Sequence, residues 1–293
     1  MLSRKKGRHF KMELLRVNHL SKHYPSFDLS DVSFSLDSGK IMGFIGRNGA
    51  GKTTTLKCIY NLISPTSGEV LYQGKNIRSI EQQAKSEIGL LFGEIEYYPN
   101  KRVGQMSKIT ASFYPSWDQN RYLSYLHDFG ISESKKIKEL SSGMKVKYGL
   151  ALALSHGAKV LILDEPTSGL DPVSRDELLD IFLDIVSDGE HAILFSTHVI
   201  SDLEKCADNI TYIQKGKILV SESVPAFEHS YTQYSGEDKD LPFDHPYFIH
   251  VRQHGGKFEA VARSESSITL PNVVSRPASL EEIMIALERG NIE

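Results

Sequence analysis

An apolar run at residues 41–45 ends in Gly46, and four residues later the triplet Gly51-Lys52-Thr53 opens a segment with helical character. The order of strand, glycine-rich turn and helix is the context that the phosphate-binding pattern G-x-x-x-x-G-K-[ST] requires. Glycines let the backbone bend so that its N–H groups reach phosphate oxygens, and the first turn of the helix adds unpaired amides and a positive dipole end. The alternative is a glycine-rich turn before an ordinary helix, but the flanking strand and helix favour a phosphate site.

The side chains of this loop predict a nucleotide and Mg²⁺ as ligands. We expect Lys52 to reach the β- and γ-phosphates and so to take part in catalysis, and the Thr53 hydroxyl to coordinate Mg²⁺. The residues expected to touch the nucleotide are Asn48, Gly49, Ala50, Gly51, Lys52, Thr53 and Thr54.

Length and composition set bounds on the rest of the chain. Its 293 residues suffice for one large core with an appendage or for two domains. With 40% hydrophobic and 24% charged residues the chain resembles a soluble globular protein, and a formal net charge of -3 gives no global indication of nucleic acid or of an anionic membrane. Cys58 and Cys206 lie far apart and outside any metal-ligand spacing, which predicts buried thiols in a reducing compartment.

Neither a membrane span nor a secretory signal is predicted. No apolar stretch approaches the ~20 residues that a span needs, and the best candidate, residues 148–163, contains His156 and Lys159. Residues 1–11 are basic but lack the apolar core of a signal. They are interpreted as a flexible extension in preference to a membrane-surface or nucleic-acid arm.

The order of apolar segments indicates an α/β domain with an insertion. The short apolar run at 159–163 is typical of a central parallel strand with both faces covered, whereas the partial alternation at 27–36 predicts an antiparallel strand. From about 94 to 157 the spacing becomes helical, which predicts an inserted helical subdomain. The predicted strands are 13–20, 27–36, 41–45, 69–72, 88–92, 159–163, 192–196, 209–213 and 217–221, and the predicted helices are 51–62, 103–114, 119–129, 143–156, 173–187 and 199–206.

A composition shift at Pro225 predicts a boundary between a domain at 12–224 and a small α+β appendage at 225–293. The polar stretch 230–244 is interpreted as a loop or linker, and 247–251, 257–262 and 267–270 as possible strands. Residues 279–282 form a capping box for a final helix that Gly290 ends. The predicted fold class is therefore α/β: a phosphate-loop NTPase parallel sheet, an antiparallel β subdomain, the inserted helices and this appendage.

Two acids follow the apolar strand at 159–163. Asp164 has the position of a second Mg²⁺ ligand in a phosphate-loop protein. Because successive strand side chains alternate between faces, Glu165 is expected to point elsewhere and to orient or deprotonate the attacking water. Paired acids at a solvated strand end are the alternative.

Two further candidates rest on their place in the chain. His198 follows a neighbouring central strand, where it is expected to contact the γ-phosphate, although a lone histidine is more often a surface or packing residue. Tyr24 lies in a turn about twenty residues before the phosphate loop, and its spacing alone leaves base stacking and core packing equally open.

Several motifs together resemble the ABC-type ATPases. Residues 140–144 (Leu-Ser-Ser-Gly-Met) are similar to the signature of that family, 161–166 (Leu-Ile-Leu-Asp-Glu-Pro) follow at the family's spacing, and 168–171 (Ser-Gly-Leu-Asp) resemble its D-loop. His198 matches the switch histidine, and Tyr24 the aromatic that stacks on adenine. The resemblance covers roughly residues 13–222.

The resemblance implies ATP and Mg²⁺ as cofactors and a nucleotide held between two subunits. Ser141, the Gly143 amide and the helix after them would bind the γ-phosphate of a second cassette, identical or homologous. Since this chain has a single G-K-[ST], a working site needs that second cassette. The family also implies a polytopic membrane permease as partner, a cytoplasmic location on the inner face of the membrane, and no nucleic acid.

The sequence departs from the family pattern at two places. After the strand at 88–92 the family usually has glutamine, whereas this chain has Gly93-Glu94, and Glu94 is a candidate Mg²⁺ or water contact in its place. The signature has Ser142 and Met144 where glycine and glutamine are commoner. The Met144-Lys145 pair resembles bacterial exporters of antibiotics, peptides or lipids.

The sequence therefore predicts an ATP-hydrolysing subunit that drives a separate permease, with Glu165, His198 and Lys52 as catalytic residues, and Thr53, Asp164 and Glu94 as metal contacts. One rival is a soluble ABC ATPase that acts on ribosomes or DNA. Another is a regulatory cassette that binds ATP but hydrolyses it weakly, which the change at Glu94 motivates.

Overall fold

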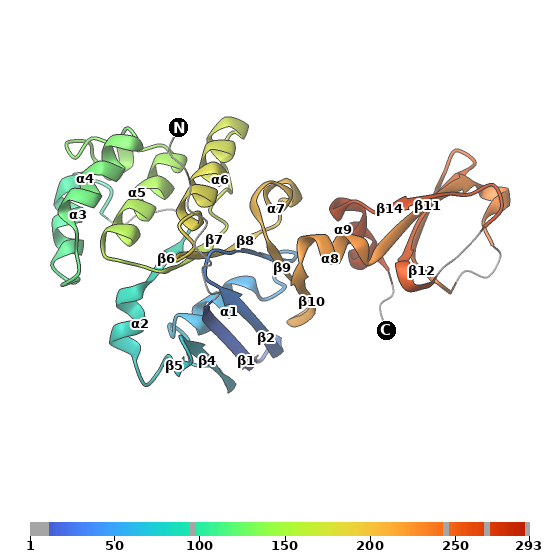
Figure 1. Ribbon diagram of the computed structural model, residues 1–293, viewed down its shortest axis with the longest axis horizontal. Helices are drawn as coiled ribbons and strands as arrows, with labels where there is room; N and C mark the ends of the chain where they lie inside the picture. Colours follow the sequence, from blue (N-terminus) through green and yellow to red (C-terminus); the bar gives the residue numbers. More distant parts are fainter. Residues whose placement is uncertain (1–11, 94–97, 243–245, 267–269, 291–293) are drawn as a thin grey trace, which may run out of the picture. The chain divides into compact units, whose positions relative to one another are not determined.

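The computed structural model describes residues 12–93, 98–242, 246–266 and 270–290 (Figure 1). The chain divides into two compact units, Met1–Ser221 and Glu222–Glu293, and each is described by itself. The predicted basic extension at 1–11 and the Glu94 position lie outside the described residues.

A six-stranded sheet forms the centre of the first unit (Figure 1). In sheet order its strands are β10 (Lys217–Ser223), β9 (Asn209–Gln214), β3 (Ile41–Ile45), β8 (Ala192–Thr197), β7 (Val160–Asp164) and β6 (Ile88–Phe92). The pairs β3–β8, β3–β9, β6–β7 and β7–β8 are parallel. Every residue of β3 and β8 is buried, as expected of parallel strands covered on both faces. The predicted parallel sheet is confirmed.

A second, antiparallel sheet has the order β2-β1-β4-β5, formed by β1 (Glu13–Tyr24), β2 (Phe27–Asp37), β4 (Ser67–Tyr72) and β5 (Lys75–Asn76). β2 alternates between buried and exposed residues, and its buried face packs against the central sheet, where the rings of Phe34 and Phe44 lie 5.5 Å apart. β1 runs four residues beyond the prediction because its pairing with β2 continues to Tyr24 opposite Phe27.

Helices cover the sheets and connect them. α1 (Lys52–Ile59) follows β3, α2 (Glu81–Glu87) precedes β6, α6 (Pro172–Val186) follows β7, and α7 (Ile200–Cys206) follows β8. α1 ends three residues before the prediction, because Asn61 adopts φ 56° and turns the chain out of the helix. The sequence did not predict α2. Most of its residues are polar, and Ala84 is its one buried residue, so it lacks the apolar spacing of a helix.

The inserted helices form a group with its own core, drawn in green in Figure 1. They are α3 (Val103–Ala111), α4 (Gln119–Asp128), the 3-10 turn η1 (Ile137–Glu139) and α5 (Ser142–Ser155). Within the core, the Ser107 hydroxyl donates to Tyr122 Oη at 2.6 Å and contacts Tyr148 Oη at 3.0 Å, so the buried hydroxyls are paired. The predicted helical insertion is confirmed.

His156, just after α5, joins these helices to α2. Its Nδ1 contacts the Ser86 carbonyl at 3.0 Å, and its ring stacks on Tyr114 with centroids 4.0 Å apart. Burial lowers the pKa of His156, while the carbonyl contacts oppose that change. A histidine with a lowered pKa in the folded state favours the neutral form, so its contribution to stability is complete above the ordinary pKa and is lost as pH falls below it.

We therefore expect the free energy of unfolding of the wild type to fall more between pH 7.5 and 5.5 than that of His156→Gln, which keeps a hydrogen-bond donor but does not titrate. Urea unfolding of both proteins at the two pH values measures the difference. Equal losses in the two proteins would contradict this role of His156.

In the residues that the structure describes, the second unit contains a four-stranded antiparallel sheet of order β12-β13-β11-β14 and two helices. Its elements are α8 (Val224–His229), β11 (Tyr231–Glu237), the 3-10 turns η2 (Asp238–Asp240) and η3 (Ser264–Ser266), β12 (Phe248–His254), β13 (Lys257–Arg263), β14 (Val274–Pro277) and α9 (Leu280–Arg289). The predicted capping box is confirmed: Ser279 and Glu282 bond reciprocally at the start of α9.

The interpretation of 230–244 as a loop is wrong for residues 231–237. This segment is β11, which pairs with β13 on one side and β14 on the other. Tyr231, Gln233 and Tyr234 are buried although the stretch is polar overall, because distant strands supply its neighbours. Of the possible strand at 267–270, residues 267–269 lie outside the described part, and Leu270 is in no strand.

Candidate functional site

The phosphate loop connects β3 to α1 in the predicted way. Gly51 is the N-cap of α1 with φ 113°, in the region that favours glycine, and a Cβ there would lie 2.9 Å from Phe27 Cζ. The Lys52 side chain is only 6% exposed, and its Nζ donates to the Gly46 carbonyl at 2.7 Å and approaches that of Arg47 at 3.4 Å. The lysine ammonium therefore lies at the centre of the loop, where phosphate oxygens would meet it.

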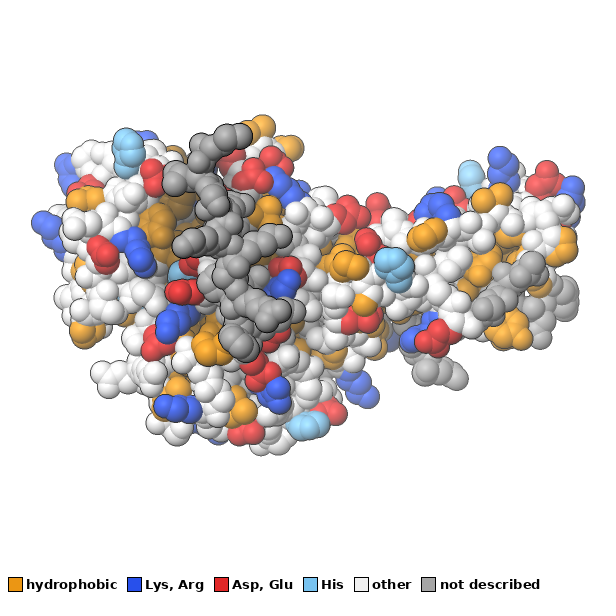
Figure 2. All heavy atoms as spheres, viewed as in Figure 1, with side chains coloured by type: hydrophobic (Ala, Val, Ile, Leu, Met, Phe, Trp, Pro, Cys, Tyr) orange, Lys and Arg blue, Asp and Glu red, His pale blue; other side chains and the backbone are white. Residues whose placement is uncertain are grey.

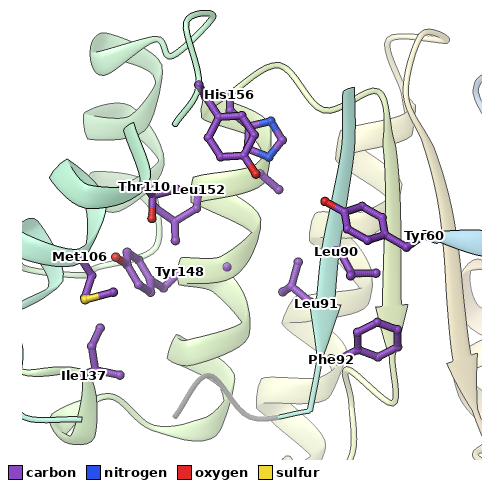
Figure 3. Close-up of a pocket in the computed structure, with 13 residues that line it drawn as sticks. Tyr60, Leu90, Leu91, Phe92, Met106, Thr110, Ile137, Tyr148, Leu152 and His156 are labelled. Atoms are coloured by element: carbon purple, nitrogen blue, oxygen red, sulfur yellow. The ribbon is translucent and has the colours of Figure 1, made fainter. Parts of the chain in front are cut away.

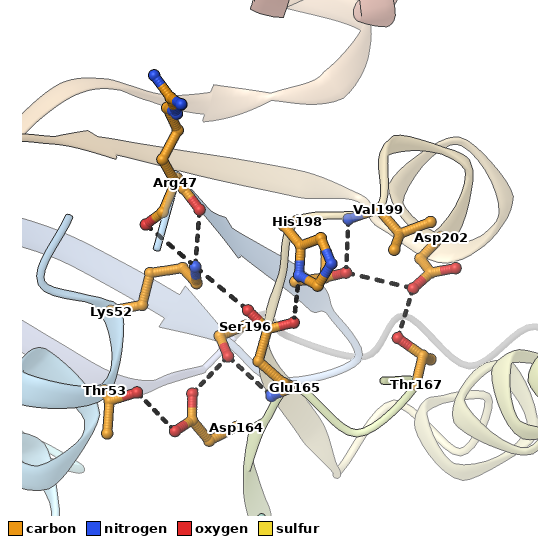
Figure 4. A network of polar contacts seen from close by, with 12 residues as sticks. Arg47, Lys52, Thr53, Asp164, Glu165, Thr167, Ser196, His198, Val199 and Asp202 are labelled. Carbon is orange, nitrogen blue, oxygen red and sulfur yellow. Dashed lines mark hydrogen bonds and ion pairs between the residues drawn. The ribbon is translucent and has the colours of Figure 1, made fainter. Parts of the chain in front are cut away.

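Asp164 ends β7 beside the loop (Figure 4). Its Oδ2 accepts from Thr53 Oγ1 at 2.7 Å, and its Oδ1 accepts from Ser196 Oγ at 2.6 Å. Thr53 and Asp164, two of the three predicted metal contacts, are thus hydrogen-bonded to each other, and Ser196 fixes the orientation of the carboxylate. Mg²⁺ prefers one or two protein oxygens together with phosphate and water, so this pair fits the ion.

Glu165 lies just beyond the strand, and its carboxylate contacts two of the other candidates (Figure 4). Its Oε1 is 3.2 Å from Lys52 Nζ, and its Oε2 is 2.8 Å from Nδ1 of His198. The expected reason for its direction is wrong: Glu165 does not continue the alternation of the strand but adopts φ 52°, in the left-handed region. Such strain in a residue other than glycine is frequent at functional sites.

A hollow of about 590 Å³ opens over this cluster. Phe27 and Ser26, at the start of β2, lie on one side of it, and Arg47 borders it in the loop; the sequence reasoning missed all three. The signal for Phe27 was the Pro25-Ser26 turn, which places it opposite Tyr24. The lining residues are Ser26, Phe27, Arg47, Asn48, Gly49, Gly51, Lys52, Thr53, Thr54 and Glu165.

Two predicted nucleotide contacts, Ala50 and Tyr24, are not in that lining. Ala50 is buried and packs with the core, and its amide donates to the Arg47 carbonyl at 3.1 Å. Tyr24 is half-buried at the end of β1, with Lys22 Nζ 5.2 Å from its ring centroid. Among the residues that line the hollow, Phe27 is therefore the aromatic one.

The signature residues Ser141 and Gly143 are likewise not in the lining of the hollow. Ser141 is the exposed N-cap of α5, and its hydroxyl accepts from the Met144 amide at 3.3 Å. Gly143 is buried, and a Cβ there would lie 3.6 Å from Ser174 Cβ in α6. The signature therefore packs next to the first turn of α6, directly after the D-loop.

Asp171, the last residue of the D-loop, caps α6. Its Oδ1 accepts from the amides of Val173 and Ser174, both at 3.0 Å, and hydrogen bonds from Ser174 hold the pKa of Asp171 below its ordinary value. This cap fixes the exposed Ser168 and Gly169 to the start of a helix.

The site combines a strand, a lysine-bearing phosphate loop and a helix with two acids at the end of another parallel strand of the same sheet, separated from the first by β8. This arrangement defines a phosphate-loop nucleoside triphosphatase. The family model described as "ABC transporter" matches residues 29–168. The chain is 30% identical to the bacitracin transport ATP-binding protein BcrA of Bacillus licheniformis, over 94% of this chain and 98% of that protein. It is 32% identical to the lantibiotic transport ATP-binding protein SrtF of Streptococcus pyogenes, over 74% of this chain and 93% of that one.

Among solved structures, the ATP-binding subunit of an ABC transporter matches with a TM-score of 0.66 and 26% identity, over 73% of this chain and 92% of the other. The chain therefore belongs to the ATP-binding proteins of ABC transporters. It is an ATP hydrolase of the kind that powers transport and works with a membrane permease. No helix in the described part of the chain has the length and apolar character needed to span a membrane.

Proposed function

We propose that this chain hydrolyses MgATP at a site completed by a second cassette, and that hydrolysis powers export of an antibiotic, peptide or lipid through a separate permease. The observation that carries the hydrolytic part is the Glu165 carboxylate between Lys52 and His198, beside the Thr53–Asp164 pair.

The roles of the site residues follow from this geometry. Thr53 and Asp164 hold Mg²⁺, which when bound neutralises charge on the phosphate oxygens. Lys52 and the amides of residues 48–54 bind the phosphates, and Phe27 offers an aromatic face to the base, with Tyr24 as the second candidate.

Hydrolysis requires a base close to the γ-phosphate. Glu165 accepts a proton from a water molecule whose oxygen attacks the γ-phosphorus, and the bond from that phosphorus to the bridging oxygen breaks with the electron pair leaving on ADP. His198 orients the Glu165 carboxylate through the 2.8 Å contact. Lys52 stabilises the negative charge that moves onto the phosphate oxygens.

The second cassette supplies what one copy lacks. Ser141 is exposed at the start of a 14-residue helix, and its hydroxyl caps the N-terminus of that helix. Such an N-terminus is suited to the γ-phosphate of a nucleotide that another copy, identical or homologous, binds. The chain is then an ATPase only as half of a pair.

Export is favoured by the relatives. BcrA and SrtF are named as bacitracin and lantibiotic transport proteins, and the match to BcrA over 94% of this chain must include most of Glu222–Glu293. The substrate class that this similarity supports is a peptide antibiotic or a similar amphiphile. The chain would act on the cytoplasmic face of the membrane, bound through its permease.

A groove in the first unit is suited to a segment of the permease (Figure 3). It has a volume of about 210 Å³ and lies between β6 and the inserted helices. Leu90 and Phe92 contribute from the sheet, and Met106, Thr110 and Leu152 from α3 and α5. Because its walls belong to both the sheet and the inserted helices, a segment seated there would follow any movement between them.

We expect Thr110→Asp, which places a charge in this groove, to weaken association with the permease about tenfold or more and to leave ATP binding unchanged, because an unpaired charge in an interface is strongly unfavourable. Ser112→Asp is the matched control: it adds the same charge at the C-cap of the same helix, at an exposed position outside the groove lining. Pull-down of the permease from detergent extracts measures both variants, and equal retention would show that the groove is not the docking site.

The decisive experiment is purification of the tagged full chain from membranes of its own host. A polytopic membrane protein that co-purifies and raises the ATPase rate supports the proposal, whereas ribosomes or DNA as the partner would refute it. On the part of the Met1–Ser221 face that Figure 2 shows uncovered, basic and acidic side chains are interspersed, whereas nucleic-acid binding favours a continuous basic surface.

A further inference from the structure

A buried carboxylate lies behind the catalytic cluster. Asp202, in α7, is 0% exposed. Its Oδ2 accepts from Thr167 Oγ1 at 2.7 Å and from Thr197 Oγ1 at 3.3 Å, whereas Oδ1 has only a long ion pair, 3.9 Å from Arg175 Nε. Neither atom of that ion pair has a hydrogen-bond partner among the described residues. A buried acid with weak charge compensation is unfavourable for stability and requires an explanation.

The two threonines place Asp202 between the catalytic segments (Figure 4). Thr167 follows Glu165 by two residues, and Thr197 directly precedes His198; both are buried. The Thr197 hydroxyl accepts from the Val199 amide at 3.0 Å, so its own proton is directed to Asp202. One carboxylate oxygen thus ties the segment after the general base to the segment before the histidine.

The backbone at Glu165 needs such support. Its φ of 52° is unfavourable for a residue other than glycine and persists only where the surrounding structure holds it. On one side the Glu165 amide donates to Ser196 Oγ at 2.9 Å, and on the other the Ser168 amide donates to the Glu165 carbonyl at 3.1 Å. Thr167 lies inside that second turn, and its hydrogen bond to Asp202 anchors the turn to α7.

We propose that Asp202 is a positioning residue for hydrolysis: by accepting from Thr167 and Thr197, it holds Glu165 and His198 in register with each other. The proposal rests on the proposed function in that it takes Glu165 as the base. Asp202 is fully buried and is not among the residues that line the hollow over the phosphate loop, so it acts on the turnover rate and not on ATP affinity.

The test removes one hydrogen bond at nearly constant volume. Thr167→Val in the full chain is expected to lower kcat about 10-fold or more, because small displacements of catalytic groups cost up to about 100-fold. KM for ATP and the affinity for a fluorescent ATP analogue should change less than about twofold. Thr167→Ser, which keeps the hydroxyl, should retain most of the wild-type kcat.

Thr211→Val is the matched control. Thr211 lies in β9 of the central sheet and, like Thr167, is a buried threonine whose hydroxyl has a polar partner. It contacts Ser221 Oγ at 2.9 Å and donates to Met42 Sδ at 3.3 Å, and it is not among the residues that line the hollow. If both valine variants lose the same stability and only Thr167→Val loses kcat, the role is positional. A parallel loss of kcat in both, or a wild-type kcat in Thr167→Val, would overturn the proposal.

A double-mutant cycle with Asp202→Asn examines the path of the effect. If Asp202 acts through Thr167, then Asp202→Asn with Thr167→Val should lose little more kcat than the worse single variant. Fully additive losses would contradict a shared path.

Hydrogen exchange separates this proposal from the proposed function. The Ser168 amide is expected to exchange faster in Thr167→Val and not in Thr211→Val, and this readout needs no hydrolysis. A wild type that neither binds nor hydrolyses ATP would refute the proposed function while the exchange result still decides whether Asp202 holds the Glu165 turn.

Discussion

Replacement of Glu165 by glutamine is expected to lower kcat about 10²- to 10⁴-fold, the usual contribution of a positioned base. The amide can still accept from His198 and lie near Lys52, because the size and shape of the side chain are almost unchanged. What is lost is the ability to take a proton from water. Steady-state release of phosphate by the full chain measures the effect, alone and with the permease.

Binding should survive the same change. In the proposed site Lys52 and the loop amides would hold the phosphates without Glu165, so the affinity for ATP should stay within a few-fold of the wild type. With ATP trapped and not hydrolysed, two copies should remain associated, and size-exclusion chromatography with MgATP should show a dimer peak that is absent with MgADP. Glu177→Gln, at an exposed residue of α6 paired with Lys147, is the control and should hydrolyse normally. A Glu165→Gln variant as fast as the wild type would remove Glu165 from the role of base.

The alternative of a regulatory cassette makes a different prediction for the wild type. A chain that binds ATP but scarcely hydrolyses it would show equally slow turnover in the wild type and in Glu165→Gln. The contact of Glu165 with both Lys52 and His198 argues for hydrolysis, because it brings a candidate base to the lysine that is proposed to bind the phosphates.

The site residues that the sequence predicted lie in short motifs that are continuous in the chain. The loop at 46–54 and the acids at 164 and 165 each follow a strand, and parallel strands bring their carboxyl ends to one edge. The Thr53–Asp164 bond, across 111 positions of the chain, follows from that rule. The same reasoning placed His198 correctly at the end of β8.

What the sequence did not predict depends on contacts between distant segments. Phe27 borders the nucleotide hollow because the β1–β2 hairpin folds it against Gly51. The Pro25-Ser26 turn indicates the hairpin, but no local pattern predicts that Phe27 then packs against the phosphate loop. Asp202 looks like an ordinary acid on a short helix until α7 packs it against Thr167. β11 reads as a polar loop because its pairing partners lie tens of residues away. Long-range packing, and not local propensity, decided each of these cases.

The second large effect is expected at Gly51. Gly51→Ala combines two costs: its φ of 113° is unfavourable for any other residue, and the new Cβ would lie 2.9 Å from Phe27 Cζ, 3.1 Å from Leu29 Cδ1 and 3.2 Å from Ile213 Cδ1. Backbone strain of this kind costs about 1–3 kcal/mol, and overpacking adds about as much. We expect the free energy of unfolding to fall by about 2–5 kcal/mol and ATP affinity to fall with it, because relief of the clash must move Phe27 or the loop.

Gly49→Ala distinguishes strain from clash. Gly49 also has a positive φ, 80°, but a Cβ there would have nothing within 4 Å. The free energy of unfolding of this variant should therefore fall only by the cost of backbone strain, about 1–3 kcal/mol. Its new side chain would point into open space beside the phosphates. Urea unfolding and titration with a fluorescent ATP analogue measure both variants. Phe27 lies against Gly51 and not against Gly49. A larger loss of stability and ATP affinity in Gly51→Ala would therefore show that close packing of β2 on the loop shapes the nucleotide site. Equal losses in the two variants would mean that these positions require glycine for their backbone conformation alone.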